Sequence, residues 1–138
     1  MNFENINSMY FIGIGGIGMS GLARYWRSRG KQISGYDKTT TTLTNELQHE
    51  GMKIVFEDDV ANLPTQIDLV VYTPAIPADH KQLNYLRAQG KTILKRSELL
   101  EELTKNLFTI AVAGTHGKTT TTTLIAHILK HSGYDCTA

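Results

Sequence analysis

The sequence predicts an α/β fold in which helices flank a parallel sheet. Short apolar runs alternate along the chain with helix-like segments, which is the order expected of βαβ units. The apolar runs are nearly continuous rather than alternating, as in strands that are covered on both faces. A glycine-rich loop joins the first run to the first helix. Together these observations predict a doubly wound sheet.

The expected strands are short apolar runs bounded by glycine, proline or charged residues. In chain order they are Met9–Ile14, Lys31–Tyr36, Lys53–Phe56, Asp68–Thr73, Lys91–Leu94 and Leu107–Ala113. The expected helices are Gly16–Arg29, Leu43–Glu50, Asp79–Gln89, Ser97–Thr104 and Lys118–His131. Gly30 and Gly51 stop the first two helices. Asp79, with Gln82 three residues on, is the expected N-cap of the third.

The chain of 138 residues is long enough for one full domain and part of another. Residues 1–104 complete the doubly wound domain, and residues 105–138 begin a second, truncated one. A net charge of +1 gives no sign of a nucleic-acid or membrane-surface protein. Cys136 is the only cysteine, and no apolar run is long enough to span a membrane. We therefore expect a cytoplasmic protein.

The first glycine loop, FIGIGGIGMSGLA, contains G-x-G-x-x-G as Gly13, Gly15 and Gly18. It follows a strand and opens a helix, where free N–H groups and the helix dipole favour a pyrophosphate. Asp37 ends the second strand, where a carboxylate can accept hydrogen bonds from ribose hydroxyls. A turn that only lets helix and strand pack closely would have the same glycines. The position of Asp37 favours a nucleotide ligand.

A second glycine loop, AVAGTHGKTTTTT, ends in Gly117-Lys118-Thr119, the last part of the P-loop pattern. Val112 stands where the pattern has its first glycine, and a glycine follows two positions later at Gly114. Backbone N–H groups of this loop can still surround a phosphate. Lys118 can then reach the β/γ-phosphates, and the Thr119 hydroxyl can bind Mg²⁺. This loop predicts an ATP site.

Two further stretches follow strands, at the sheet edge that lines the ligand crevice in open α/β folds. YTPAIP, residues Tyr72–Pro77, is either part of that crevice or a proline-stiffened turn. Arg96 is either an anion contact or an ordinary surface arginine. The sequence leaves both pairs of alternatives open.

The two glycine loops, in this order and with these letters, resemble the start of a Mur ligase. FIGIGGIGMSGLARY and VAGTHGKTTTT carry the resemblance, with support from ISGYD, FEDDV, YTPAIP and KRSELLEEL. It implies a Rossmann-like UDP-binding domain over residues 1–104. It also implies the first strand, P-loop and helix of a central ATPase domain over residues 105–138. The missing first P-loop glycine is normal for this family.

By matching position, the resemblance assigns residues to two ligands. Those implied for UDP are Gly15, Gly16, Ile17, Gly18, Asp37, Thr73, Pro74 and Ala75, with the glycine loop on the diphosphate. Those implied for ATP are Gly114, Thr115, His116, Gly117, Lys118, Thr119 and Thr120. Lys118 and Thr119 are the implied catalytic residues, and Thr119 is the implied Mg²⁺ ligand. The family usually has two serines at Thr73-Pro74, so Pro74 offers no hydroxyl contact.

The resemblance further implies a step of peptidoglycan precursor synthesis, and so of cell wall formation, cell shape and cell division. ATP phosphorylates the lactyl carboxylate of UDP-N-acetylmuramic acid, L-alanine attacks the acyl phosphate, and phosphate leaves. The letters of the two loops favour L-alanine over a recycled tripeptide as the amine. Because the later Mg²⁺ ligands and the amino-acid site lie downstream in this family, we expect residues 1–138 alone to be inactive.

Two alternatives from other functional classes remain. An NAD-dependent oxidoreductase domain would account for the first glycine loop and Asp37, but it leaves Gly114–Thr119 unexplained. A non-catalytic nucleotide-sensing module would also fit a chain of this length. Ligand preference, a uridine sugar nucleotide against NAD, separates these readings. The sequence does not indicate an oligomeric state.

Overall fold

The computed structural model describes residues 3–105 and 107–137. The chain divides into two compact units, Met1–Lys105 and Asn106–Ala138. Within the described residues, the first unit contains every strand and the second contains one α-helix. No helix in these residues is long and apolar enough to cross a membrane. That the second unit begins an ATP-binding domain stays a prediction.

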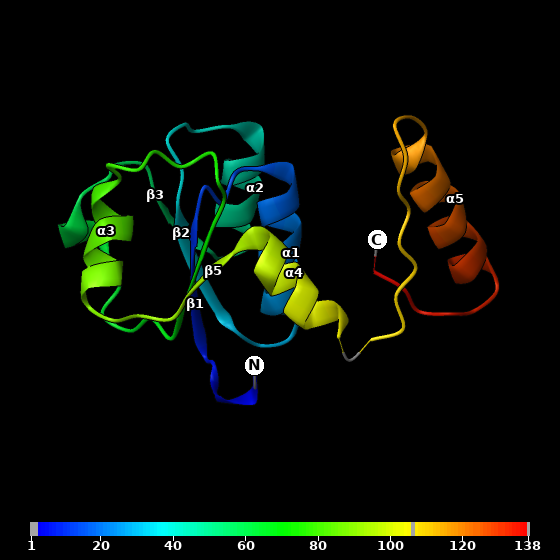
Figure 1. The fold of residues 1–138 in the computed structure, drawn as a ribbon, viewed down its shortest axis with the longest axis horizontal. Coiled ribbons are helices and arrows are strands. Elements are labelled where there is room, and N and C mark those ends of the chain that lie inside the picture. Colours follow the sequence, from blue (N-terminus) through cyan, green and yellow to red (C-terminus); the bar gives the residue numbers. More distant parts are fainter. Residues whose placement is uncertain (1–2, 106, 138) are drawn as a thin grey trace. The chain divides into compact units, whose positions relative to one another are not determined.

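The first unit is built on a parallel sheet of five strands (Figure 1). The strands are β1 (Ser8–Ile12), β2 (Gln32–Tyr36), β3 (Lys53–Val55), β4 (Leu69–Tyr72) and β5 (Ile93–Lys95). Their order in the sheet is β3-β2-β1-β4-β5, and every neighbouring pair is parallel. The predicted α/β class is confirmed. The order reverses between β1 and β4, so a crevice for ligands is expected at the carboxyl ends of these two strands.

Helices cover both faces of the sheet, as the continuous apolar strands predict. Figure 1 shows α1 (Ile17–Ser28), α2 (Thr42–His49) and α4 (Arg96–Thr104) on one face and α3 (Lys81–Ala88) on the other. Every residue of β1 is buried, and its side chains alternate between the two layers. Phe11 packs in the cluster that holds Trp26 of α1, whereas Tyr10 packs with Leu83 of α3. This central strand therefore fixes the position of the loop that follows it.

The start of α3 differs from the prediction. Its N-cap is His80 rather than Asp79, and the His80 Nδ1 atom accepts the Leu83 N–H at 3.3 Å. Asp58, from the loop after β3, accepts the first two N–H groups of the helix at 2.8 and 2.9 Å. A capping pattern read along the sequence cannot detect an acceptor that comes from a distant segment. Burial lowers the pKa of His80, although Asp58 Oδ1 lies 3.2 Å from its Nδ1.

The second unit contains α5 (Lys118–His131). The strand predicted for Leu107–Ala113 is wrong, because these residues have no regular secondary structure. A strand requires a neighbouring strand, and the described residues of this unit offer none. Apolar side chains of the run are exposed, most of all Phe108 at 95%. An apolar run alone does not specify a strand, because it does not show which segment will pair with it.

Candidate nucleotide site at the first glycine loop

Gly13 turns the chain out of β1. Its φ is 86°, a left-handed value that favours glycine. The N–H groups of Gly13 and Ile14 both donate to the carbonyl of Tyr36, at 2.7 and 3.0 Å, which ties the loop to the end of β2. A Cβ at Gly13 would lie 2.9 Å from Cγ2 of Thr73. The turn therefore packs directly against the segment that follows β4.

Asp37 holds the next part of the loop. Its Oδ2 accepts the Gly15 N–H at 2.7 Å, and its Oδ1 accepts the Thr39 N–H at 3.2 Å. A Cβ at Gly15 would lie 2.8 Å from that same Oδ2, so glycine is needed for this approach. The sequence suggested Asp37 only as a ribose ligand. The structure adds a second role, because the carboxylate fixes the backbone of the glycine loop.

The start of α1 leaves backbone donors unpaired. The Gly16 N–H donates to the Gly13 carbonyl at 3.2 Å, and the Met19 N–H donates to the Gly16 carbonyl at 3.0 Å. Within residues 3–105, the N–H groups of Ile17 and Gly18 have no acceptor. Two unpaired N–H groups at the positive end of a helix form a suitable place for a phosphate.

A cavity of about 420 Å³ opens beside this loop, at the carboxyl ends of β1 and β4. It brings together six residues predicted for UDP, namely Gly15, Gly16, Gly18, Asp37, Thr73 and Ala75. Two others, Ile17 and Pro74, do not line the described cavity, and the Ile17 side chain is 89% exposed. Arg96, which the sequence left undecided, lies in the lining. The cavity therefore joins segments that are far apart in the sequence.

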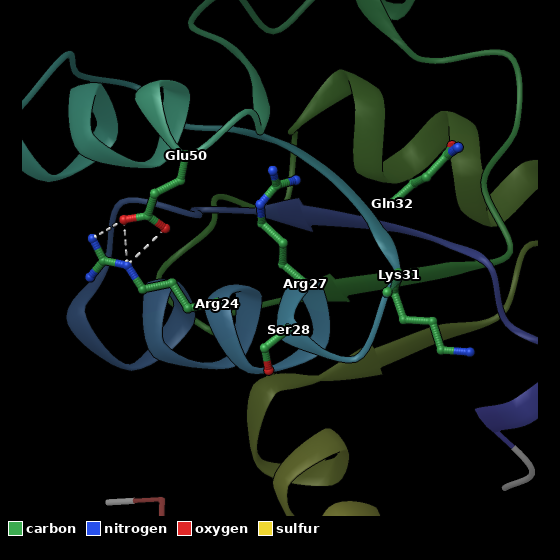
Figure 2. Close-up of a pocket in the computed structure, with 7 residues that line it drawn as sticks. Arg24, Arg27, Ser28, Lys31, Gln32 and Glu50 are labelled. Atoms are coloured by element: carbon green, nitrogen blue, oxygen red, sulfur yellow. Dashed lines mark hydrogen bonds and ion pairs between the residues drawn. The ribbon is translucent and has the colours of Figure 1, made fainter.

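A larger depression lies away from this edge, between the end of α1 and the start of β2 (Figure 2). Arg24 lies in it and pairs with Glu50 through contacts of 2.6–3.1 Å. The Lys31 ammonium group also has a partner within the protein, because its Nζ donates a hydrogen bond to the carbonyl of Phe3 at 2.9 Å. The depression is a weaker candidate than the glycine-loop cavity, because Arg24 is already paired with Glu50 and because the depression adjoins the amino end of β2.

The second glycine loop has its own local geometry in the second unit. Gly117 caps α5 with a φ of 77°, a left-handed value. The Lys118 Nζ folds back across the loop and donates to the carbonyl of Gly114 at 2.8 Å. Thr119 follows in the first turn of α5, and the whole loop is exposed. These donors and the hydroxyl suit a phosphate and a hard cation.

The fold and the cavity at its switch point define an α/β protein of the doubly wound class with a glycine loop at β1. A family model described as "Mur ligase family, catalytic domain" matches residues 8–107. This chain belongs to the Mur ligase family.

The most informative relatives share both sequence and structure with the chain. UDP-N-acetylmuramate–L-alanine ligases of Cytophaga hutchinsonii and Flavobacterium johnsoniae are 52% and 51% identical and match 100% of the chain. The chain spans 31% and 32% of their lengths, about a third. The crystal structure of the UDP-N-acetylmuramate–alanine ligase from Thermotoga maritima is 36% identical. It matches 90% of this chain with a TM-score of 0.84, and the match covers 29% of that protein.

A murein peptide ligase from Psychrobacter arcticus has the same TM-score of 0.84, with 33% identity. The match covers 91% of this chain and 27% of that protein. The two solved structures therefore match the fold of this chain equally well, although their names describe different ligases.

Proposed function

We propose that this chain supplies the sugar-nucleotide site of an ATP-dependent ligase that joins L-alanine to UDP-N-acetylmuramic acid. The observation that carries the proposal is the cavity at the switch point, where the glycine loop, Asp37 and Thr73 meet. Relatives about half identical over the full chain bear the name of that ligase. The reaction belongs to peptidoglycan precursor synthesis, and the expected location is the cytoplasm.

The first unit suits a diphosphate and a ribose. The unpaired N–H groups of Ile17 and Gly18, at the start of α1, would hold the diphosphate. Asp37 would accept hydrogen bonds from ribose hydroxyls through lone pairs that its two backbone contacts leave free. Thr73, Pro74 and Ala75 would lie along the uridine, with Thr73 as the hydroxyl-bearing member. Gly15 and Gly16 shape the loop, since their N–H groups are already bonded within the protein.

The second unit would contribute to ATP binding through residues 114–120, which include Thr115, His116 and Thr120. Lys118 would exchange its contact with the Gly114 carbonyl for the β/γ-phosphates. Thr119 would hold Mg²⁺, which screens the phosphate charge when bound. The described residues contain no cluster of three His, Cys, Asp or Glu side chains that could hold a metal. The chain spans about a third of the L-alanine ligases it matches. We infer that further Mg²⁺ ligands in such a ligase come from segments outside that third, and that residues 1–138 alone are inactive.

In such a ligase, a phosphoryl group moves from ATP to the lactyl carboxylate. The amine then forms the amide bond as phosphate leaves. Phosphoryl transfer depends mainly on positioning and on neutralising charge. The contribution of this chain is therefore to bind and orient the nucleotide sugar, and to place Lys118 beside the phosphates.

One alternative keeps the family and changes the amine. Murein peptide ligases share the fold, and the two solved structures are 33% and 27% identical to this chain, against 36% for the solved L-alanine ligase. The curated L-alanine ligases are 52% and 51% identical. That difference favours L-alanine. The related tripeptide-attaching ligase stays as the second candidate.

Calorimetric titration of the 138-residue chain tests the proposal. UDP-N-acetylmuramic acid should release heat and saturate at one site, whereas NAD should give none. Binding of NAD without binding of the sugar nucleotide would contradict the proposal and favour an oxidoreductase domain. Phosphate release that depends on L-alanine from the pure 138-residue chain would contradict its expected inactivity.

A further inference from the structure

Arg96 lies against the first turn of α1, although it comes from the start of α4. A Cβ built on Gly18 would lie 2.7 Å from its Nη1 atom and 3.5 Å from its Cδ atom. The arginine therefore extends along the helix backbone at a point where any side chain would displace it. Gly18 has a function here beyond the approach of a phosphate, because it makes room for the guanidinium.

The guanidinium of Arg96 has no partner within the protein. Among residues 3–105 and 107–137, it makes no hydrogen bond and no ion pair. Asp37 lines the same cavity, yet its carboxylate oxygens bond the N–H groups of Gly15 and Thr39 instead. Arg96 is thus an exposed residue on the cavity lining, with five N–H donors and no anion of the protein paired with them.

Two further donors share this cavity edge. The N–H groups of Ile17 and Gly18 are unpaired at the positive end of α1. A guanidinium in contact with Gly18 can reach a phosphate bound there and form two parallel hydrogen bonds to it. A lysine would supply charge without this fork.

We propose that Arg96 is a ligand of the diphosphate of the uridine sugar nucleotide. This inference rests on the proposed function and adds a residue to its binding site. The guanidinium binds the side of the diphosphate that the loop N–H groups leave open. The site consequently selects nucleotides by the number of phosphates they carry, preferring UDP to UMP and UMP to uridine.

Ligand-observed NMR titrations with UDP, UMP and uridine test this proposal. The variants are Arg96→Met, which keeps the aliphatic stem over Gly18, and Arg96→Lys, which keeps the charge. Arg96→Met should weaken UDP binding by roughly 10-fold or more and leave uridine binding unchanged. Arg96→Lys should fall between it and the wild type. Arg27→Met, from the other depression, is the matched control and should bind all three ligands like the wild type.

Three results would overturn the proposal. Equal UDP affinity in Arg96→Met and wild type would show that the guanidinium does not touch the diphosphate. An equal loss of UDP and uridine binding would show that Arg96 only maintains the shape of the cavity. If wild-type chain bound NAD and neither UDP nor uridine, the proposed function would fail together with this inference, whereas the first two results leave that function standing.

Discussion

Replacing Gly35 with alanine would place a methyl group where the backbone of β1 already lies. Gly35 pairs with Phe11 in the centre of the sheet. The new Cβ would lie 2.4 Å from the Phe11 carbonyl oxygen and 3.0 Å from Cδ1 of Ile14. The first distance is about 1 Å shorter than an ordinary nonbonded contact. Because the obstacle is backbone, a change of rotamer cannot relieve the clash.

We expect Gly35→Ala to lower the free energy of unfolding by about 3 kcal/mol, the upper part of the usual range for overpacking. For a unit of this size, that corresponds to a fall of roughly 15 °C in Tm. Trp26 is the single tryptophan and is buried in the first unit, so its fluorescence reports unfolding of that unit. Ile14 would also be displaced, so nucleotide binding should weaken in parallel.

Gly21→Ala is the matched control. Gly21 lies within α1, and a Cβ there meets nothing within 4 Å. Alanine should stabilise the helix by about 0.5–1 kcal/mol. The reasoning would be refuted if the free energy of unfolding of Gly35→Ala lay within about 1 kcal/mol of the wild-type value, the lower limit of usual overpacking effects. Equal destabilisation by both variants would refute it as well.

Three further predictions concern buried or charge-bearing groups of the first unit. Tyr10→Phe should cost about 1–2 kcal/mol in urea unfolding, because the buried Tyr10 hydroxyl donates to Gln82 Oε1 at 2.8 Å and that oxygen would lose its donor; an unchanged midpoint would contradict this. Burial lowers the pKa of His80, so protonation opposes folding and wild-type stability should fall as the pH drops from about 6.5 toward the lowered pKa. His80→Asn keeps an acceptor for the Leu83 N–H and should remove that part of the pH dependence; the same slope in both proteins would count against it. Backbone N–H groups around the start of β1 lower the pKa of Asp68, so its stabilising effect should be present above pH 3.8 and disappear as the pH falls through the lowered pKa. Asp68→Asn should accordingly be less stable than wild type at pH 7 and equal to it in strong acid, and a difference that persisted in acid would contradict the assignment.

Local sequence patterns predicted the parts of the fold that depend on local physics. The apolar runs around Tyr10 and Val70 indicated buried parallel strands, because only doubly covered strands are apolar on both faces. Gly13 and Gly18 indicated a tight strand-to-helix turn, and the structure contains one at that place. The positions of Asp37 and Thr73 beside this turn followed from the rule that ligands bind at the carboxyl ends of strands.

What sequence reasoning missed depends on contacts between distant segments. Asp58 caps α3 across the sheet edge, and no pattern near the helix reveals it. The contact of Arg96 with Gly18 joins α4 to α1 and becomes visible only once both helices lie on the same face. The run Leu107–Ala113 has strand-like composition, but composition does not show whether a partner strand exists.

The measurement that tests the central claim most directly is a map of backbone amide chemical shifts during titration with UDP-N-acetylmuramic acid. The account predicts that the largest changes fall on Ile17 and Gly18, with further changes at Asp37 and Thr73. Changes confined to the depression around Arg24, or none at saturating ligand, would contradict the claim that the glycine loop forms a nucleotide site.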